Sequence, residues 1–94
     1  MIVGICRIEL YLPGVSSLKE KRGVLKSLLA RLHNTFNVSA AEVDHQDLWQ
    51  SAQIGIAIVT NSTAHADQIF RSLLEWIETH YPDALITRHE IDLR

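Results

Sequence analysis

The chain has 94 residues, 47% of them hydrophobic and 21% charged, with a formal net charge of −2 at pH 7. These values predict one small domain over residues 1–94, and the net charge argues against a general nucleic-acid binder. The single cysteine, Cys6, excludes an internal disulfide and a multi-cysteine metal site, so we expect a reducing, cytoplasmic setting. No apolar run approaches the ~20 residues that a membrane span needs, and the first ten residues lack the basic start of a signal peptide.

The periodicity of apolar residues predicts six elements in the order β-α-β-β-α-β. The leucines of the first helix share one face at helical spacing, and the residues of the first strand alternate between apolar and polar. Leu-Pro-Gly at 12–14 ends that strand, and Pro82 ends the second helix. The expected strands are 2–12, about 37–43, about 52–60 and about 84–93; the expected helices are about 17–36 and a second that starts at the cap residues 60–63.

This order is typical of the ferredoxin-like α+β sandwich, with two helices on one face of a four-stranded antiparallel sheet. Right-handed crossovers place the first and third strands in the centre and leave the other sheet face open. The open face should show Val3, Ile5, Arg7, Glu9, Tyr11, Gln53, Gly55, Ala57, Val59 and part of the last strand.

The open face is the first candidate for binding. Its third strand carries no aromatic residue and its first carries only Tyr11, so the pattern disfavours stacking of RNA bases. A mixed apolar and charged face is better suited to pairing with a second copy of the chain. The candidate contacts for such a dimer are Val3, Ile5, Arg7 and Tyr11.

The second candidate is the basic start of the first helix. Lys19, Lys21 and Arg22 fall in its first two turns, where the positive end of the helix dipole disfavours cations. Lys19, Arg22, Lys26 and His33 form one strip on the helix. Lys21 instead falls within the leucine stripe, and we expect its stem to cross the core and its amine to emerge near a strand end.

Two interpretations of these cations are open. A helix N-terminus with several cations is a plausible phosphate site, with Lys19, Lys21, Arg22 and Lys26 as its residues and Arg31 as a weaker candidate. Residues 1–38 carry a net charge of +4 and residues 39–94 carry −6, which indicates a basic face. The alternative is that the cations pair with Glu42, Asp44 or Asp47 of the same chain.

Catalytic and metal chemistry have little support. The stretch Glu42 to Trp49 holds acids and one histidine without a recognised ligand spacing, and we interpret it as a polar connection anchored by Leu48 and Trp49. Cys6 is expected on the buried strand face, where thiols are inert. We therefore expect no catalytic residue, no metal, no cofactor and no enzymatic activity.

The strings SLKEKR (17–22) and FNVSAAEVDHQDLWQ (36–50) resemble the YlxP-like family of small bacterial proteins, a domain of unknown function. The likeness covers essentially the whole chain. Gly23 departs from the family pattern, since a helix former would be expected there. The resemblance implies a ferredoxin-like fold and a genomic setting among genes of transcription termination, translation initiation and ribosome maturation, and it brings no catalytic residue.

The leading hypothesis is a cytoplasmic, non-enzymatic accessory protein that contacts RNA or a ribosomal subunit through the basic first helix. The rival is a protein-interaction module that forms a homo-oligomer through the open sheet and meets an acidic protein with its basic helix. A third hypothesis is an effector-binding domain that uses the sheet interface as a small-ligand pocket, which rests on fold alone. We expect no membrane partner.

Overall fold

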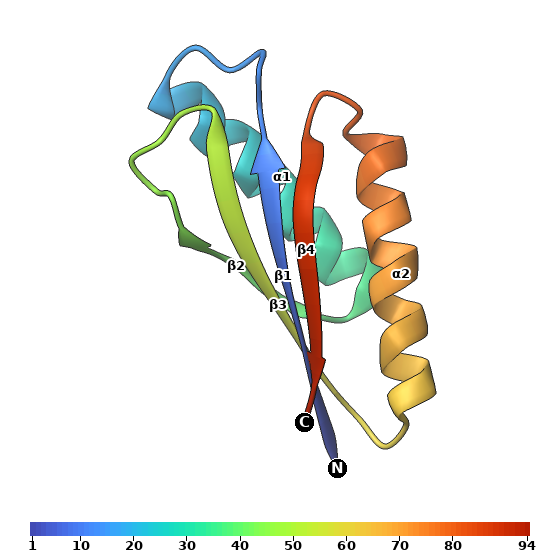
Figure 1. Cartoon of the computed structure of the whole chain (residues 1–94). Helices are drawn as coiled ribbons and strands as arrows, with labels where there is room; N and C mark the ends of the chain where they lie inside the picture. The colour runs from blue at the N-terminus through green and yellow to red at the C-terminus, as the bar shows by residue number, and fades with distance from the viewer.

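The computed structural model describes all 94 residues and contains the six expected elements (Figure 1). They differ from the expected elements only at their ends. Asn37 has the left-handed conformation (φ 52°, ψ 52°) that closes a helix, so the second strand begins two residues later than expected. The bounds are β1 (Ile2–Tyr11), α1 (Leu18–Phe36), β2 (Ser39–Asp44), β3 (Ser51–Thr60), α2 (Thr63–His80) and β4 (Leu85–Leu93).

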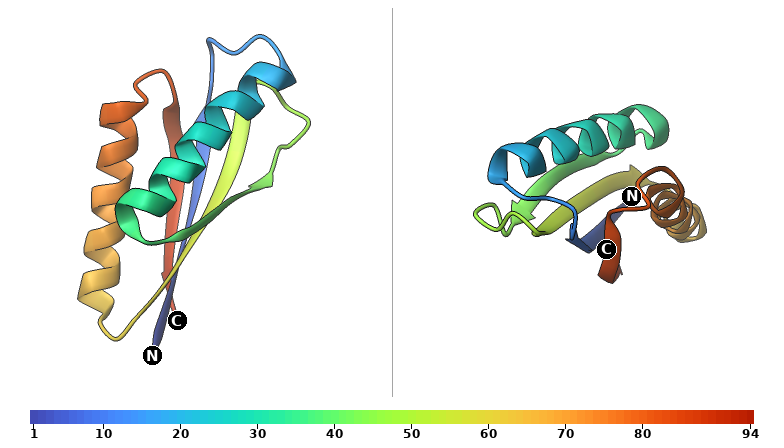
Figure 2. Two further views of the ribbon diagram at one scale, coloured as in Figure 1. Left: turned by 180° about the vertical axis from the view of Figure 1, so that it is seen from behind. Right: turned by 90° about the horizontal axis from the view of Figure 1, so that it is seen from above.

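The strands form one antiparallel sheet in the order β2-β3-β1-β4. Both helices cover the same face of this sheet and leave the other face open (Figure 2). This is the expected ferredoxin-like α+β sandwich, with β1 and β3 in the centre. The two ends of the chain lie side by side, because Val3 and Arg94 exchange two backbone hydrogen bonds of 2.9 Å.

The core lies between the sheet and the helices. Alternate residues of β1 and β3 are buried, as the period of two requires, and each helix contributes one apolar stripe. Phe70 of α2 is fully buried against Gly4 of β1, where a Cβ atom would lie only 3.0 Å from the phenyl ring. Neither helix combines the length and the apolar character needed to cross a membrane.

Capping explains how α1 begins with cations in its first turns. The Ser17 hydroxyl accepts a hydrogen bond from the Glu20 amide at 3.1 Å, and the Glu20 carboxylate accepts hydrogen bonds from the Ser16 amide and hydroxyl. These hydrogen bonds, the one from the backbone amide first, lower the pKa of Glu20. The carboxylate also places a negative charge at the positive end of the helix dipole.

Candidate phosphate-binding strip on the first helix

Lys19, Arg22 and Lys26 lie on the solvent-exposed side of α1 at positions i, i+3 and i+7, and we call them the α1 strip. All three side chains are exposed, and none forms an ion pair with a carboxylate of the chain. Glu20 does not neutralise them, because its carboxylate binds Ser16. The α1 strip is therefore a row of cations without an internal counter-charge.

The other six cations of the chain all have partners. Of its nine lysines and arginines, five form ion pairs with carboxylates and one, Arg31, packs on aromatic rings. The remaining three are the residues of the α1 strip. The ion-paired residues are Arg7, Lys21, Arg71, Arg88 and Arg94.

Lys21 lies in the core and does not belong to the strip. Its amine lies at the end of β2, as expected, but it stays buried there and does not emerge into solvent. The side chain is 1% exposed, and its Nζ lies 2.8 Å from Oε2 of Glu42 in β2. The same amine donates hydrogen bonds to the backbone carbonyls of His45 and Leu48. An amine enclosed in this way is not accessible to a phosphate outside, and we remove Lys21 from the candidate phosphate-binding residues.

The alternative that cations pair with acids of the same chain is therefore correct for Lys21 and Glu42. Oε2 of Glu42 is buried and accepts no hydrogen bond, since the 2.8 Å contact with Nζ lacks the angle of one. The ammonium charge of Lys21 alone compensates this oxygen. Neither Asp44 nor Asp47 forms an ion pair with the α1 strip, although the sequence made both of them possible partners.

The connection between β2 and β3 is held by hydrogen bonds of its backbone carbonyls and of the His45 ring. Leu48 and Trp49 are 50% and 52% exposed, so the expectation that they anchor this segment is wrong. The anchors are the two carbonyls that bind Lys21 and a hydrogen bond of 2.9 Å between the His45 ring and the Ser51 hydroxyl. A charge buried in the core can hold a loop whose own apolar side chains remain in solvent.

Arg31, the weaker phosphate candidate, lies over two aromatic rings. Its guanidinium carbon is 5.0 Å from the centre of the Trp76 ring and 5.3 Å from that of Tyr81, and its Nη1 donates to the Tyr81 hydroxyl at 3.2 Å. Trp76 also stacks on His80 and meets Phe36 edge to face. No expectation from the sequence covered this cluster, although the aromatic residues 76, 80 and 81 near the end of α2 indicate it.

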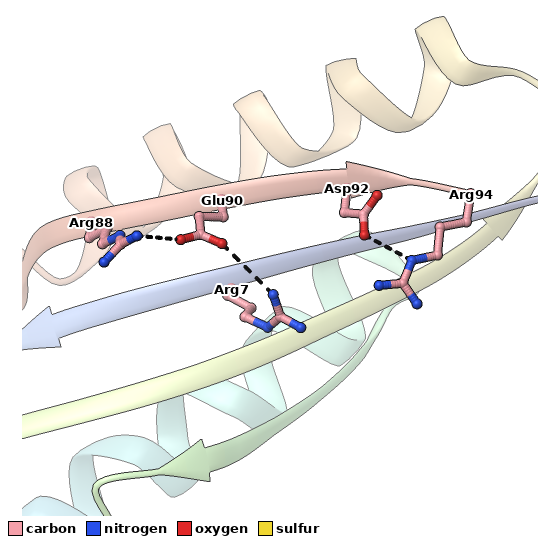
Figure 3. A network of polar contacts seen from close by, with 5 residues as sticks. All are labelled: Arg7, Arg88, Glu90, Asp92 and Arg94. Carbon is pink, nitrogen blue, oxygen red and sulfur yellow. Dashed lines mark hydrogen bonds and ion pairs between the residues drawn. The ribbon is translucent and has the colours of Figure 1, made fainter.

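The open sheet face carries the expected residues of β1 and part of β4, which contributes a row of charges. Arg88 binds Glu90 at 2.7 Å, Glu90 lies 3.8 Å from Arg7, and Asp92 binds Arg94 at 2.8 Å (Figure 3). Apolar side chains remain exposed around this row. They are Val59, which is 70% exposed, Leu85 at 48% and Tyr11 at 43%, with the half-buried Val3 and Ile5 beside them.

Cys6 lies on the buried side of β1, as expected, and it is fully enclosed. Desolvation by burial raises the pKa of its thiol to about 11, so the nucleophilic thiolate is scarce at neutral pH. No three histidine, cysteine or acidic side chains gather as a metal site would require.

Comparison with known proteins identifies the family of the chain. Residues 3–91 match the family described as "Protein of unknown function (DUF503)". The chain is 38% identical over 91 residues to "Uncharacterized protein YlxP" of Bacillus subtilis (strain 168), and the match covers 95% of this chain and 98% of that protein.

Proposed function

The chain belongs to the DUF503 family of YlxP-like proteins, to which no function is assigned, and we therefore propose a function from its surface. We propose that the α1 strip binds the phosphates of RNA, either as free RNA or within a ribosomal subunit. One observation carries this proposal. Every lysine and arginine outside Lys19, Arg22 and Lys26 is already engaged within the chain. Cations left together on one exposed helix face can release counterions when they meet a phosphate backbone.

The rest of the surface limits the kind of RNA contact. The central strands offer only Tyr11 as a stacking platform, so bases would not be read on the sheet. Contact through three cations to phosphates fixes position without selecting a base sequence. We therefore propose binding that depends on the shape and charge of the RNA. The genomic setting implied by the family resemblance points to the same class of partner.

Salt dependence tests this proposal. If three phosphates are neutralised, the logarithm of the affinity should fall against the logarithm of salt with a slope of about −2 for single strands and about −2.7 for a duplex. Fluorescence anisotropy with labelled single-stranded and hairpin RNA measures the slope, and cosedimentation with purified ribosomal subunits tests the particle. A flat titration for free RNA together with no cosedimentation at low salt would overturn the proposal.

Reversing the charges of the α1 strip tests whether the strip is the site that binds RNA. The triple variant Lys19→Glu, Arg22→Glu and Lys26→Glu should weaken RNA binding at least tenfold at low salt, since each lost phosphate contact removes about one unit of salt slope. The matched control is Arg71→Glu, Arg88→Glu and Arg94→Glu, which changes the net charge equally but alters cations that are ion-paired elsewhere. Equal losses in both variants would show that net charge, and not the strip, attracts the RNA.

A second candidate function is self-association through the open sheet face. The observation that favours it is the exposure of Val59, Tyr11 and Leu85 beside a row of charges of both signs. A surface that carries both signs can complement itself across a twofold axis, as an isologous dimer requires. Apolar side chains around the row would then be buried between two sheets.

Sedimentation equilibrium tests the dimer. We expect a concentration-dependent dimer in which Val59→Asp raises the dissociation constant at least tenfold, because the charge would be buried at the interface without a partner. Lys26→Asp is the control on the exposed helix surface and should leave the dimer unchanged. A strict monomer at millimolar concentration would contradict this candidate function without affecting the RNA proposal.

A further inference from the structure

A hollow beside α1 is lined by no residue of the α1 strip and by none of the open sheet face. It has a volume of about 620 Å³ and lies between the first half of α1 and the connection from α2 to β4. Both of these segments lie at the upper end of the view in Figure 1. We call this hollow the α1–α2 groove. Its size is within the range of small-molecule sites.

Glycines line the α1–α2 groove at two places where the fold does not require them. Gly14 and Gly23 have no atom within 4 Å of the position a Cβ would occupy, and neither has a positive φ. The other two glycines differ, because a Cβ on Gly4 or Gly55 would come within 3.0 Å of a packed side chain. Gly23 also lies inside a helix, where glycine is less favourable than alanine. Internal packing therefore explains the glycines elsewhere and leaves the two at the groove unexplained.

The lining of the groove has a definite chemistry. Leu12, Val15, Val24 and Ala84 supply apolar surface, and the only ionisable acids are Glu20 and Asp83. No lysine or arginine lines it. Asp83 has no ion-pair partner within the chain. An apolar surface with carboxylates and without cations complements a molecule that has an apolar body and a positive charge.

Hydroxyl groups join the two sides of the groove. The hydroxyl groups of Ser27 in α1 and of Tyr81, which follows α2, form a hydrogen bond of 2.8 Å. Both residues line the groove. The Tyr81 hydroxyl is further fixed by Arg31. This bridge holds the helix and the connection at a set separation, so the groove is formed before a ligand arrives. A preformed site loses less conformational entropy on binding.

We propose that the α1–α2 groove binds a small organic cation, an amine or guanidinium with an aromatic or aliphatic body. The body lies on the apolar surface beside Gly14 and Gly23, where the missing side chains let it approach the backbone. The charged group pairs with the carboxylate of Asp83 and with Oε1 of Glu20, since the Ser16 hydrogen bonds to Glu20 occupy only Oε2. No residue of the α1 strip lines this site, although the two adjoin on the helix, because Gly23 lies four residues after Lys19 and three before Lys26.

A matched pair of probes tests the charge requirement. Phenethylamine and its neutral counterpart 2-phenylethanol are titrated into the ¹⁵N-labelled full chain, and the amide shifts of Gly14, Gly23 and Asp83 are followed by NMR. We expect saturable shifts at these amides, with the amine binding about fivefold more tightly, the factor of a partly exposed ion pair. Asp83→Asn with Glu20→Gln should remove this preference. Equal affinity for both probes in the unmodified chain, or shifts elsewhere only, would overturn the proposal.

Substitutions at Gly23 separate binding from folding. Gly23→Ala should raise Tm by about 4–8 °C, because alanine is the better helix former and meets no atom within 4 Å. Gly23→Val should fill the groove and weaken phenethylamine binding at least tenfold, whereas Ala30→Val, on exposed helix surface outside the groove, should leave it unchanged. A fall in Tm for Gly23→Ala would mean that the fold needs this glycine, and unchanged binding by Gly23→Val would mean that the groove is not the site.

Discussion

Replacing Lys21 with methionine should lower the free energy of unfolding by about 3–5 kcal/mol, because it leaves a buried charge without its partner. Oε2 of Glu42 accepts no hydrogen bond and depends on the ammonium 2.8 Å away. The carbonyls of His45 and Leu48 would also lose their donor. Methionine keeps most of the volume of the lysine stem, so the loss reports the polar contacts more than a cavity. Urea unfolding at fixed ionic strength measures the change.

A double-mutant cycle identifies the pair as the cause. Glu42→Gln alone leaves the Lys21 amine with two neutral partners, and the double variant Lys21→Met with Glu42→Gln leaves no uncompensated charge. We expect the double variant to lose less than the two single losses combined, with a coupling of about 1–3 kcal/mol. Lys19→Met is the matched control, since Lys19 is exposed and unpaired, and it should change stability by less than about 0.5 kcal/mol. Equal effects at the two lysines would contradict burial of Lys21 in solution.

Replacing Phe70 with alanine should lower the free energy of unfolding by about 3–5 kcal/mol, because the ring is fully buried at the contact between α2 and β1. Its Cε2 and Cζ atoms lie 3.0 and 3.2 Å from the position of a Cβ on Gly4. Gly4→Ala should therefore cost about 1–3 kcal/mol by overpacking, although alanine is ordinarily the better residue in a strand. Urea unfolding with the same protocol measures both variants.

The two substitutions should compensate each other. With the ring removed, only Ile58 Cγ1, at 3.0 Å, still crowds a Cβ on Gly4, so Gly4→Ala in the Phe70→Ala background should cost less than in the unmodified chain. If the Phe70→Ala variant is too unstable to fold, Phe70→Leu takes its place in the double-mutant cycle. Gly55→Ala is the control, since the Cβ would meet only Val43, which is 52% exposed and able to move. Additive losses at Gly4 and Phe70 would disprove the predicted contact.

The cations in the first turns of α1 have two different environments, because Lys21 is buried and the residues of the α1 strip are exposed. The Glu20–Ser16 hydrogen bonds satisfy the helix start, and Lys21 binds Glu42 and the connection from β2 to β3. Lys19, Arg22 and Lys26 are exposed and form no ion pair. Cations placed near the positive end of a helix are mildly unfavourable. A phosphate partner would offset that cost, which is a further reason to test the strip first.

The sequence by itself determined the fold and the direction in which most side chains point. Alternation along β1 and β3 placed Cys6 inside and Arg7 and Tyr11 on the open face, because a strand sends successive side chains to opposite sides. Helical spacing placed Lys19, Arg22 and Lys26 on one exposed side in the same way. These results follow from local geometry, which the order of residues fixes without reference to the rest of the chain.

Only the tertiary structure decided which groups meet. The sequence made Glu42, Asp44 and Asp47 equal candidates as partners of the cations, and the register of β2 against β3, with its irregularity between Glu42 and Asp44, brought only Glu42 to Lys21. The groove beside Gly23 and the stacking of Arg31 on Trp76 likewise depend on how the two helices lie across the sheet. Pairings of this kind join residues tens of positions apart, and the periodicity of one segment contains no information about the distance to another.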